Sequence, residues 1–224
     1  VGWILLTPII LFVILMVLLY IPPVQNLLHR EVTAYASKAT GMQIQVERID
    51  LRFPLNLLVR GVEVIQQPDT LLSLESLNVR VQAWPLLKGK VEVDEVTLSQ
   101  VAVNSANLIE GMQIKGVLGR FFLQSHGVDL SNETAVVNRT ELSDTHIQLL
   151  MTDTTTTPKD TTASAPVNWK VNLHQLKLKN VSFGMKLPAD SMKMAAYIGE
   201  ATIDDAKADL KNQFYGLKQF LLSG

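Results

Sequence analysis

The sequence predicts a mainly β protein that follows one apolar helix at its N-terminus. Three features indicate this fold. Residues 1–21 contain no charged side chain, and helical spacing of apolar residues follows as far as Gly41. From Gln43 onward, apolar residues recur with the period of two that is typical of strands. We therefore expect a transmembrane helix and one amphipathic helix, and then a curved, bulged, antiparallel-type β-sheet.

The anchor is expected over residues 1–21. A helix rises about 1.5 Å per residue, so roughly 20 residues cross the ~30 Å hydrocarbon layer. A cleaved signal peptide, with Ala34-Tyr35-Ala36 as its cleavage site, and a buried core helix are the alternatives. The length of the apolar run and its lack of a polar face favour a retained anchor. The residues expected in the membrane are Trp3, Ile4, Leu5, Leu6, Ile9, Ile10, Leu11, Phe12, Val13, Ile14, Leu15, Met16, Val17, Leu18, Leu19 and Tyr20.

Residues 22–41 are expected to form the amphipathic helix. Pro22-Pro23 ends the anchor, and apolar residues from Val24 to Ala39 then recur three and four positions apart. Gly41 is placed to take the left-handed conformation that ends a helix. This helix either packs on its own domain or lies in the membrane interface. Its polar face is poor in Lys and Arg, which favours the first.

The strand region repeats a specific pattern. Apolar residues fall at positions i, i+2, i+5 and i+7, with polar or small residues at i+3 and i+4. Five copies are clear: Ile44, Val46, Ile49 and Leu51; Leu57, Val59, Val62 and Val64; Leu72, Leu74, Leu77 and Val79, which Val81 continues; Val91, Val93, Val96 and Leu98; and Val171, Leu173, Leu176 and Leu178. A weaker copy is Ala196, Ile198, Ala201 and Ile203.

The step of three inside this pattern would move the second half of a flat strand to the other face. One extra, unpaired residue, which is a β-bulge, returns all four apolar side chains to one face. A tight hairpin is the alternative, but it favours Gly-rich pairs. The pairs at i+3 and i+4 are Glu47-Arg48, Arg60-Gly61, Glu75-Ser76, Asp94-Glu95 and His174-Gln175, and only one contains Gly. We therefore expect bulged strands and a curved sheet.

A Thr-rich segment of low complexity, residues 152–166, divides the β region into residues 42–151 and 167–224. Such a segment cannot bury a core, so we expect a flexible loop. The chain begins without Met inside an apolar run and stops inside a strand-like run. We expect it to be a piece of a longer protein.

Composition and motifs give no support for catalysis. The net charge is -1 and there is no Cys, so neither a basic field for nucleic acid nor thiolate chemistry is indicated. His29, His126, His146 and His174 lack metal-ligand spacing, and the phosphate-loop-like run from Gly111 to Gly116 lacks the Lys that must follow. Asp94-Glu95 and Asp204-Asp205 are neighbours on strands and should point to opposite faces. We expect no enzyme, cofactor or metal site.

One-sided strands in such number ordinarily form a closed β-sandwich, which would be a scaffold or adhesin-like domain. An open curved sheet is the other reading. It would leave an apolar surface larger than a soluble monomer tolerates, so it would need an apolar occupant, either another protein or lipid.

The residues also resemble the N-terminal region of the AsmA-like family. The resemblance is carried by the single anchor, by the helix that ends at Thr40-Gly41, and by the strand pair Ile44–Phe53 and Leu57–Val64. The most specific feature is the run Trp84-Pro-Leu-Leu-Lys-Gly-Lys-Val-Glu-Val-Asp-Glu-Val-Thr-Leu98, in which a short turn leads into a strand. The match covers about residues 1–104.

This resemblance implies a β-groove that starts at the inner membrane of a Gram-negative bacterium and crosses the periplasm. Its lining would be the twenty strand residues of the five clear copies above, and it would carry phospholipid toward the outer membrane. In one branch of the family the groove works with an outer-membrane barrel partner of the Omp85 type and assists outer-membrane protein assembly. That partner would bind through a C-terminal part that this chain lacks.

Four short runs resemble an O-glycosylation acceptor that one group of bacteria uses on exported proteins. Each has Asp followed by Ser or Thr and then an apolar residue or Thr. The alternative is ordinary turn chemistry of Asp and Ser or Thr. The expected acceptors are Thr70, Thr154, Thr161 and Ser191.

Overall fold

The computed structural model describes residues 33–35, 37–52, 55–86, 92–105, 108, 111–129, 133–151, 168–187 and 192–223. The expected anchor, residues 22–32 of the amphipathic helix and the Thr-rich segment 152–166 lie outside these residues. The described residues include no helix long and apolar enough to cross a membrane.

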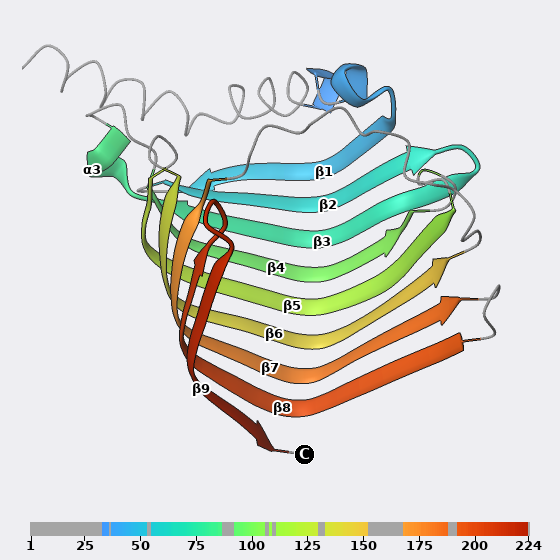
Figure 1. Cartoon of the computed structure of the whole chain (residues 1–224). Coiled ribbons are helices and arrows are strands. Elements are labelled where there is room, and N and C mark those ends of the chain that lie inside the picture. Colours follow the sequence, from blue (N-terminus) through green and yellow to red (C-terminus); the bar gives the residue numbers. More distant parts are fainter. Residues whose placement is uncertain are drawn as a thin grey trace, which may run out of the picture.

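The described part of the chain is mainly β, as predicted (Figure 1). Its strands form one open sheet in sequence order, from β1 at one edge to β9 at the other. The strands are β1 (Gln43–Arg52), β2 (Asn56–Gln66), β3 (Asp69–Val81), β4 (Val93–Asn104), β5 (Met112–Asp129), β6 (Thr134–Met151), β7 (Lys170–Leu187), β8 (Met192–Asp209) and β9 (Phe214–Ser223). One short helix, α3 (Ala83–Leu86), lies between β3 and β4.

Neighbouring strands are antiparallel with one exception. β6 and β7 run parallel, with Thr134 opposite Lys170 and Leu150 opposite Lys186. The prediction of an antiparallel-type sheet is therefore wrong at this pair. Periodicity defines which residues form strands but not the direction in which two strands pair. Because β6 and β7 are neighbours, the strands before and after the Thr-rich segment belong to the same sheet.

The helix before β1 ends as predicted. Residues 37–40 are helical, and Gly41 takes a φ of 69°, in the left-handed region. The Gly41 amide donates to the Ser37 carbonyl at 3.0 Å. The Ser37 hydroxyl oxygen also accepts from the Ile44 amide at 3.1 Å. The helix end is thereby joined to β1.

A line of unpaired residues, which we call the first crease, crosses eight of the strands. In β1 and β2 the register omits the pair Glu47 and Gly61 and is the same on both sides of it. For each further two neighbouring strands up to β8, the register likewise leaves one residue of each strand without a partner. The first crease consists of Glu47, Gly61, Glu75, Gln100, Gly119, Asp144, Asn180 and Gly199.

The backbone explains why the strands bend at this crease (Figure 1). Gly61, Gln100, Asp144 and Asn180 have φ values of 58°, 50°, 51° and 53°. A single left-handed residue turns an extended chain, and Gly, Asn and Asp adopt this conformation at the lowest cost. Residues in the left-handed conformation therefore occupy the first crease in β2, β4, β6 and β7.

A second crease lies six residues along the strands from the first. The register shifts so that Asp94 of β4 and Asn138 of β6 are left without partners. On β7, β8 and β9 the omitted residues are His174, Asp205 and Lys218, and Asp205 has a φ of 52°. The strands that carry both creases bend twice.

The predicted pairs at i+3 and i+4 all lie inside strands and at creases, so the tight-hairpin alternative is wrong. One detail of the bulge prediction also differs. Only Asp94, among the predicted positions, is a bulge with an extra residue in one strand. At the first crease neither strand has an extra residue, because every strand contributes one unpaired position to the same line.

Candidate functional site

The register aligns apolar side chains into ladders that run from strand to strand. The first ladder is Ile44, Val64, Leu72, Val103, Gly116, Ile147, Phe183 and Ala196. The second is Val46, Val62, Leu74, Val101, Leu118, Thr145, Val181 and Ile198. The third is Ile49, Val59, Leu77, Leu98, Phe121, Leu142, Leu178, Ala201 and Leu222. The fourth is Leu51, Leu57, Val79, Val96, Leu123, Thr140, Leu176, Ile203 and Phe220.

These four ladders share one face of the sheet, which we call the apolar face. Residues two apart on a strand point to the same side, and the first crease places two polar or small residues between the second and third ladders. In β1, for example, Val46 and Ile49 are half-buried whereas Glu47 and Arg48 between them are exposed. No ladder position carries a charge. We call the opposite face the charged face.

The ladders are long. Strands lie about 4.8 Å apart, so the eight steps from β1 to β9 cover roughly 38 Å. The third and fourth ladders extend over this whole distance. The apolar face is therefore a continuous path across the sheet rather than a local pocket.

Little of this path is covered within the described residues. Only five hydrophobic side chains there are buried: Leu71, Leu74, Ala135, Val137 and Ala201. Leu217, Phe220 and Leu222 at the β9 edge are 54%, 53% and 64% exposed. Substantial contacts between described elements join only neighbouring strands, so no second sheet packs on the first. The closed β-sandwich, the alternative for the fold, is wrong for this part of the chain.

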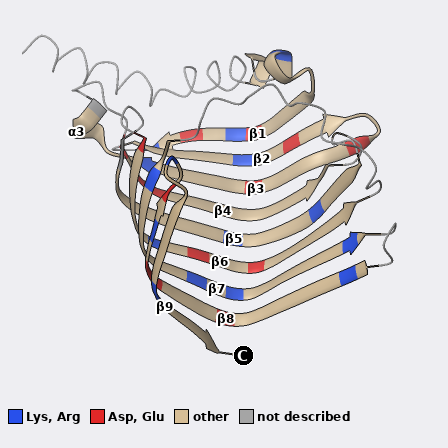
Figure 2. Ribbon diagram, in the orientation of Figure 1, with Lys and Arg blue, Asp and Glu red and all other residues tan. Residues whose placement is uncertain are grey.

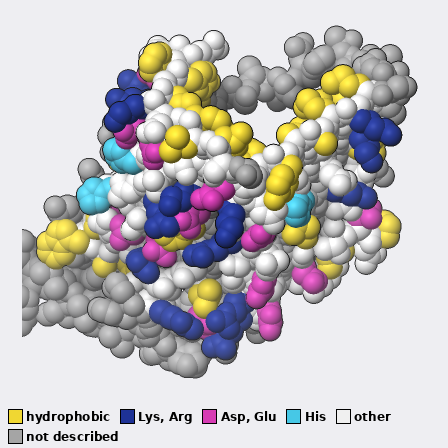
Figure 3. All heavy atoms as spheres, turned by 90° about the horizontal axis from the view of Figure 1, so that it is seen from below, with side chains coloured by type: hydrophobic (Ala, Val, Ile, Leu, Met, Phe, Trp, Pro, Cys, Tyr) yellow, Lys and Arg dark blue, Asp and Glu magenta, His cyan; other side chains and the backbone are white. Residues whose placement is uncertain are grey.

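The space-filling view shows how the two faces differ. Hydrophobic side chains gather on both walls of a hollow at the top of Figure 3, and charged side chains gather on the surface turned away from it. In Figure 2 the charged positions are distributed over most strands, with acidic and basic residues interspersed. The sheet therefore presents a charged outer side and an apolar hollow.

Most of the residues predicted to line the groove lie in these ladders. Three predicted residues lie outside the four ladders, beyond the second crease. Val93 is opposite Val81, and Val171 and Leu173 are opposite Ala208 and Ala206. Val91 lies outside the described residues. The sequence pattern did not identify the ladder residues of β5, β6 and β9, nor four others. Those four, Val101, Val103, Val181 and Phe183, continue the pattern past the positions where the predicted copies ended.

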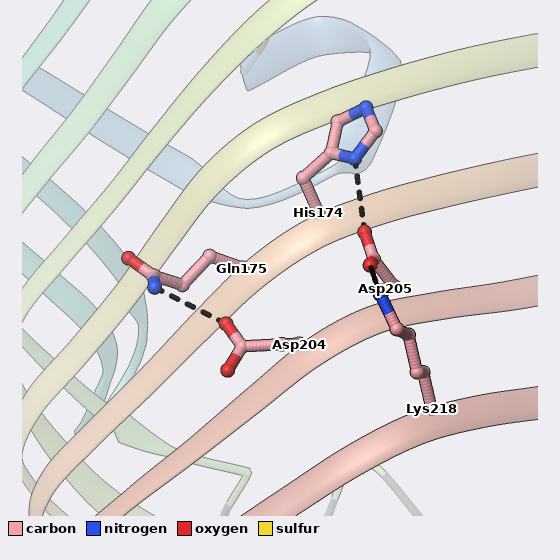
Figure 4. Close-up of polar contacts among 5 residues, drawn as sticks. All are labelled: His174, Gln175, Asp204, Asp205 and Lys218. Carbon is pink, nitrogen blue, oxygen red and sulfur yellow. Dashed lines mark hydrogen bonds and ion pairs between the residues drawn. The ribbon is translucent and has the colours of Figure 1, made fainter.

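A polar cluster lies at the second crease, between β7, β8 and β9 (Figure 4). The Asp205 carboxylate contacts His174 Nδ1 at 3.2 Å and accepts from Lys218 Nζ at 3.0 Å. Gln175 Nε2 donates to Asp204 at 3.2 Å, so the two adjacent carboxylates have separate partners. The hydrogen bond from Lys218, and then that from His174, lower the pKa of Asp205. The cluster ties three strands together, and its charged groups are engaged with one another, so we assign it a structural role.

The expected modification sites are mostly outside the described residues. Thr154, Thr161 and Ser191 fall there. Thr70 is exposed near the start of β3, directly after the turn at residues 67–68.

Comparison of the chain with protein-family models, with curated proteins and with solved structures finds no significant match. The class of the molecule therefore comes from its own geometry. It is an open, creased β-sheet with an uncharged apolar face.

Proposed function

We propose that this chain is a lipid-handling groove of the Gram-negative envelope, of the AsmA-like kind and most like the translocation and assembly module protein, TamB. The observation that carries the proposal is the set of uninterrupted, uncharged ladders on the hollow face of a bent sheet. In this proposal residues 1–21 anchor the chain in the inner membrane and the sheet stands in the periplasm. The chain has no enzymatic role.

Lipid acyl chains suit this face for a physical reason. A protein ligand needs partners for its own polar groups, whereas an acyl chain needs only apolar contact. Burial of apolar surface gives about 25 cal/mol per Å², without any requirement for direction, so a chain can slide along the ladders. A continuous path of this kind favours conduction of phospholipid between membranes over storage in one place.

Assistance to outer-membrane protein assembly is the other role that the resemblance implies. The same apolar ladders would hold the apolar side of an extended, unfolded segment. A barrel partner of the Omp85 type would act through parts of the protein beyond this chain.

Two valines provide a matched test of the lipid proposal. Val103 belongs to the first ladder and is 39% exposed; Val117, on the next strand and the opposite face, is 46% exposed. Val103→Asp puts a charge on the apolar face, and Val117→Asp puts the same charge on the charged face. We expect phospholipid that co-purifies with the full chain to fall several-fold in the first variant only.

Folding is checked in both variants by circular dichroism and thermal unfolding. Equal lipid content in the two folded variants and in the unchanged chain would contradict the proposal. Loss of lipid in both would also contradict it, because the effect would then not depend on the face.

A further inference from the structure

Five of the seven methionines lie together at one end of β5–β8. Met112 is opposite Met151, Met185 is opposite Met194, and Met192 is two residues from Met194. All five continue the alternation of the ladders, so they belong to the apolar face. Met192 and Met194 are 46% and 45% exposed. Unbranched, polarisable Met side chains adapt to ligands of variable shape, as a fluid acyl chain is.

Three lysines occupy the charged face at the same end. Figure 2 shows them as blue segments at one end of β5, β7 and β8, with no acidic segment beside them on β5–β8. Lys186 is directly opposite Lys193, and Lys115 lies two strands from Lys186, on the other side of β6, and two residues from their row. No described carboxylate forms an ion pair with any of the three.

The three lysines line one cavity of about 480 Å³. Gly184 and Ala195, which are opposite each other, give it a low floor, and Leu150 and Met194 contribute apolar surface. Like charges directly opposite on neighbouring strands repel each other and destabilise a sheet. A negative group bound between Lys186 and Lys193 would relieve this repulsion.

We propose that this end of β5–β8 is a headgroup site for an anionic glycerophospholipid. The inference rests on the proposed function and adds the place and the class of lipid. The phosphate lies among Lys115, Lys186 and Lys193, and the acyl chains pass over the strand ends onto the methionines of the apolar face. Lys stems are long enough to keep the ammonium at such a rim while their methylenes cover apolar surface. Ammonium groups bind phosphate as point charges, so the site reads charge rather than headgroup shape.

The test uses the full chain in mild detergent and three lipids with the same fluorescent acyl label. These are phosphatidylglycerol, zwitterionic phosphatidylcholine, and diacylglycerol, which has no phosphate. We expect phosphatidylglycerol to bind most tightly and to lose this advantage at about 0.5 M NaCl, where exposed charges are screened. The triple variant Lys115→Gln, Lys186→Gln, Lys193→Gln should lose about tenfold in affinity for phosphatidylglycerol. Its affinity for diacylglycerol should stay unchanged.

The matched control is Lys177→Gln, Lys179→Gln, Lys207→Gln, which removes the same charge from the middle of β7 and from β8. It should bind all three lipids as the unchanged chain does. A second variant, Gly184→Leu, fills the floor of the cavity without removing charge and should also weaken phosphatidylglycerol selectively.

The outcomes separate the two proposals. If the unchanged chain binds none of the lipids, the groove proposal fails. If it binds diacylglycerol and phosphatidylglycerol equally, or if the triple variant and its control behave alike, the groove stands and the headgroup site is overturned. Displacement of phosphatidylglycerol by free glycerol phosphate at equal concentration would overturn it as well, because the site would then serve a soluble phosphate ester.

Discussion

Gly119 on β5 faces Asp144 on β6 at the first crease, and a Cβ added to Gly119 would lie 2.7 Å from the Asp144 Cβ. The same Cβ would meet the carbonyl oxygens of Asp144 and Ser143 at 3.0 and 3.2 Å, so the backbone itself would have to move. The crease therefore requires a glycine beside each bulky polar residue that turns outward. Gly61 and Glu47 repeat the relationship on β2 and β1, at 2.6 Å.

Replacement of Gly119 tests this requirement. Gly119→Ala should lower the free energy of unfolding by about 1–3 kcal/mol, the usual cost of overpacking. Gly184→Ala is the control, since the nearest atom to its added Cβ would be Gln148 Cγ at 3.9 Å. It should stay within about 0.5 kcal/mol of the unchanged chain. Urea denaturation of both variants measures the difference, and equal stabilities would disprove the steric account.

Asn180 tests the left-handed backbone of the crease. It has a φ of 53°, and its Nδ2 donates to Asp144 Oδ1 at 2.8 Å. Asn180→Gly removes the hydrogen bond but keeps the conformation accessible. Asn180→Val removes the bond and adds strain of about 1–2 kcal/mol. We expect the valine variant to melt at the lower temperature, and the reverse order would count against a conformational role for this position.

Two leucines test how far the apolar residues of the sheet are covered. Leu74 of the second ladder is 9% exposed, whereas Leu217, which is opposite Ala206 beyond the second crease, is 54% exposed. Leu74→Ala should destabilise the chain by about 2–3 kcal/mol, because it leaves a cavity. Leu217→Ala removes little buried surface and should cost less than about 1 kcal/mol. Chemical denaturation distinguishes them; a large loss at Leu217 would mean that something covers this edge.

Asp205 gives the stability a defined dependence on pH. Its partners Lys218 and His174 lower the pKa of its carboxyl in the folded chain below the unfolded value of about 3.9. A carboxyl with a lowered folded pKa stabilises the fold above the unfolded pKa and loses that contribution as pH falls through the folded value. Asp205→Asn should therefore melt below the unchanged chain at pH 7. The gap should begin to narrow below about pH 4 and should close once the pH is below the folded pKa. A gap that persists at low pH would refute this assignment.

The strands could be predicted because each crease produces the interval of three in the apolar pattern of the sequence. In β1, β2, β3 and β7 the apolar residues on both sides of a crease are Val, Ile or Leu, so the interval of three is visible. In β4 the pattern also fits Val96, Leu98, Val101 and Val103, and the crease at Gln100 lies inside this second copy. A strand with two creases therefore contains two overlapping copies of the apolar pattern. Periodicity alone does not show which copy lies at which crease.

β5 and β6 could not be found in this way. Gly116 on β5 and Thr140 and Thr145 on β6 occupy ladder positions where the pattern expects a large apolar residue. Thr145 is 1% exposed and satisfies its hydroxyl locally by donating to the Ser143 carbonyl at 3.1 Å. A threonine whose hydroxyl is bonded to its own strand can be buried at low cost. Such a residue looks like a polar position in the sequence.

The lysine and methionine cluster was hidden for a different reason. Lys115 is far in sequence from Lys186 and Lys193, and the parallel pairing of β6 with β7 brings them to one end of the sheet. An antiparallel pairing would have put the end of β7 at the opposite end of β6. The candidate headgroup site therefore depends on the one strand pair whose direction the sequence did not predict.

The central claim is that the apolar face contacts lipid, and photocrosslinking along β6 tests it most directly. A photoreactive residue is placed in turn at Glu141, His146, Ile147 and Leu149 of the full chain in its native membrane, and lipid adducts are measured by mass spectrometry. Ile147 belongs to the first ladder and Leu149 continues its alternation, whereas Glu141 and His146 lie on the charged face. We predict phospholipid adducts at Ile147 and Leu149 only. Adducts at all four positions alike, or at none, would contradict the account.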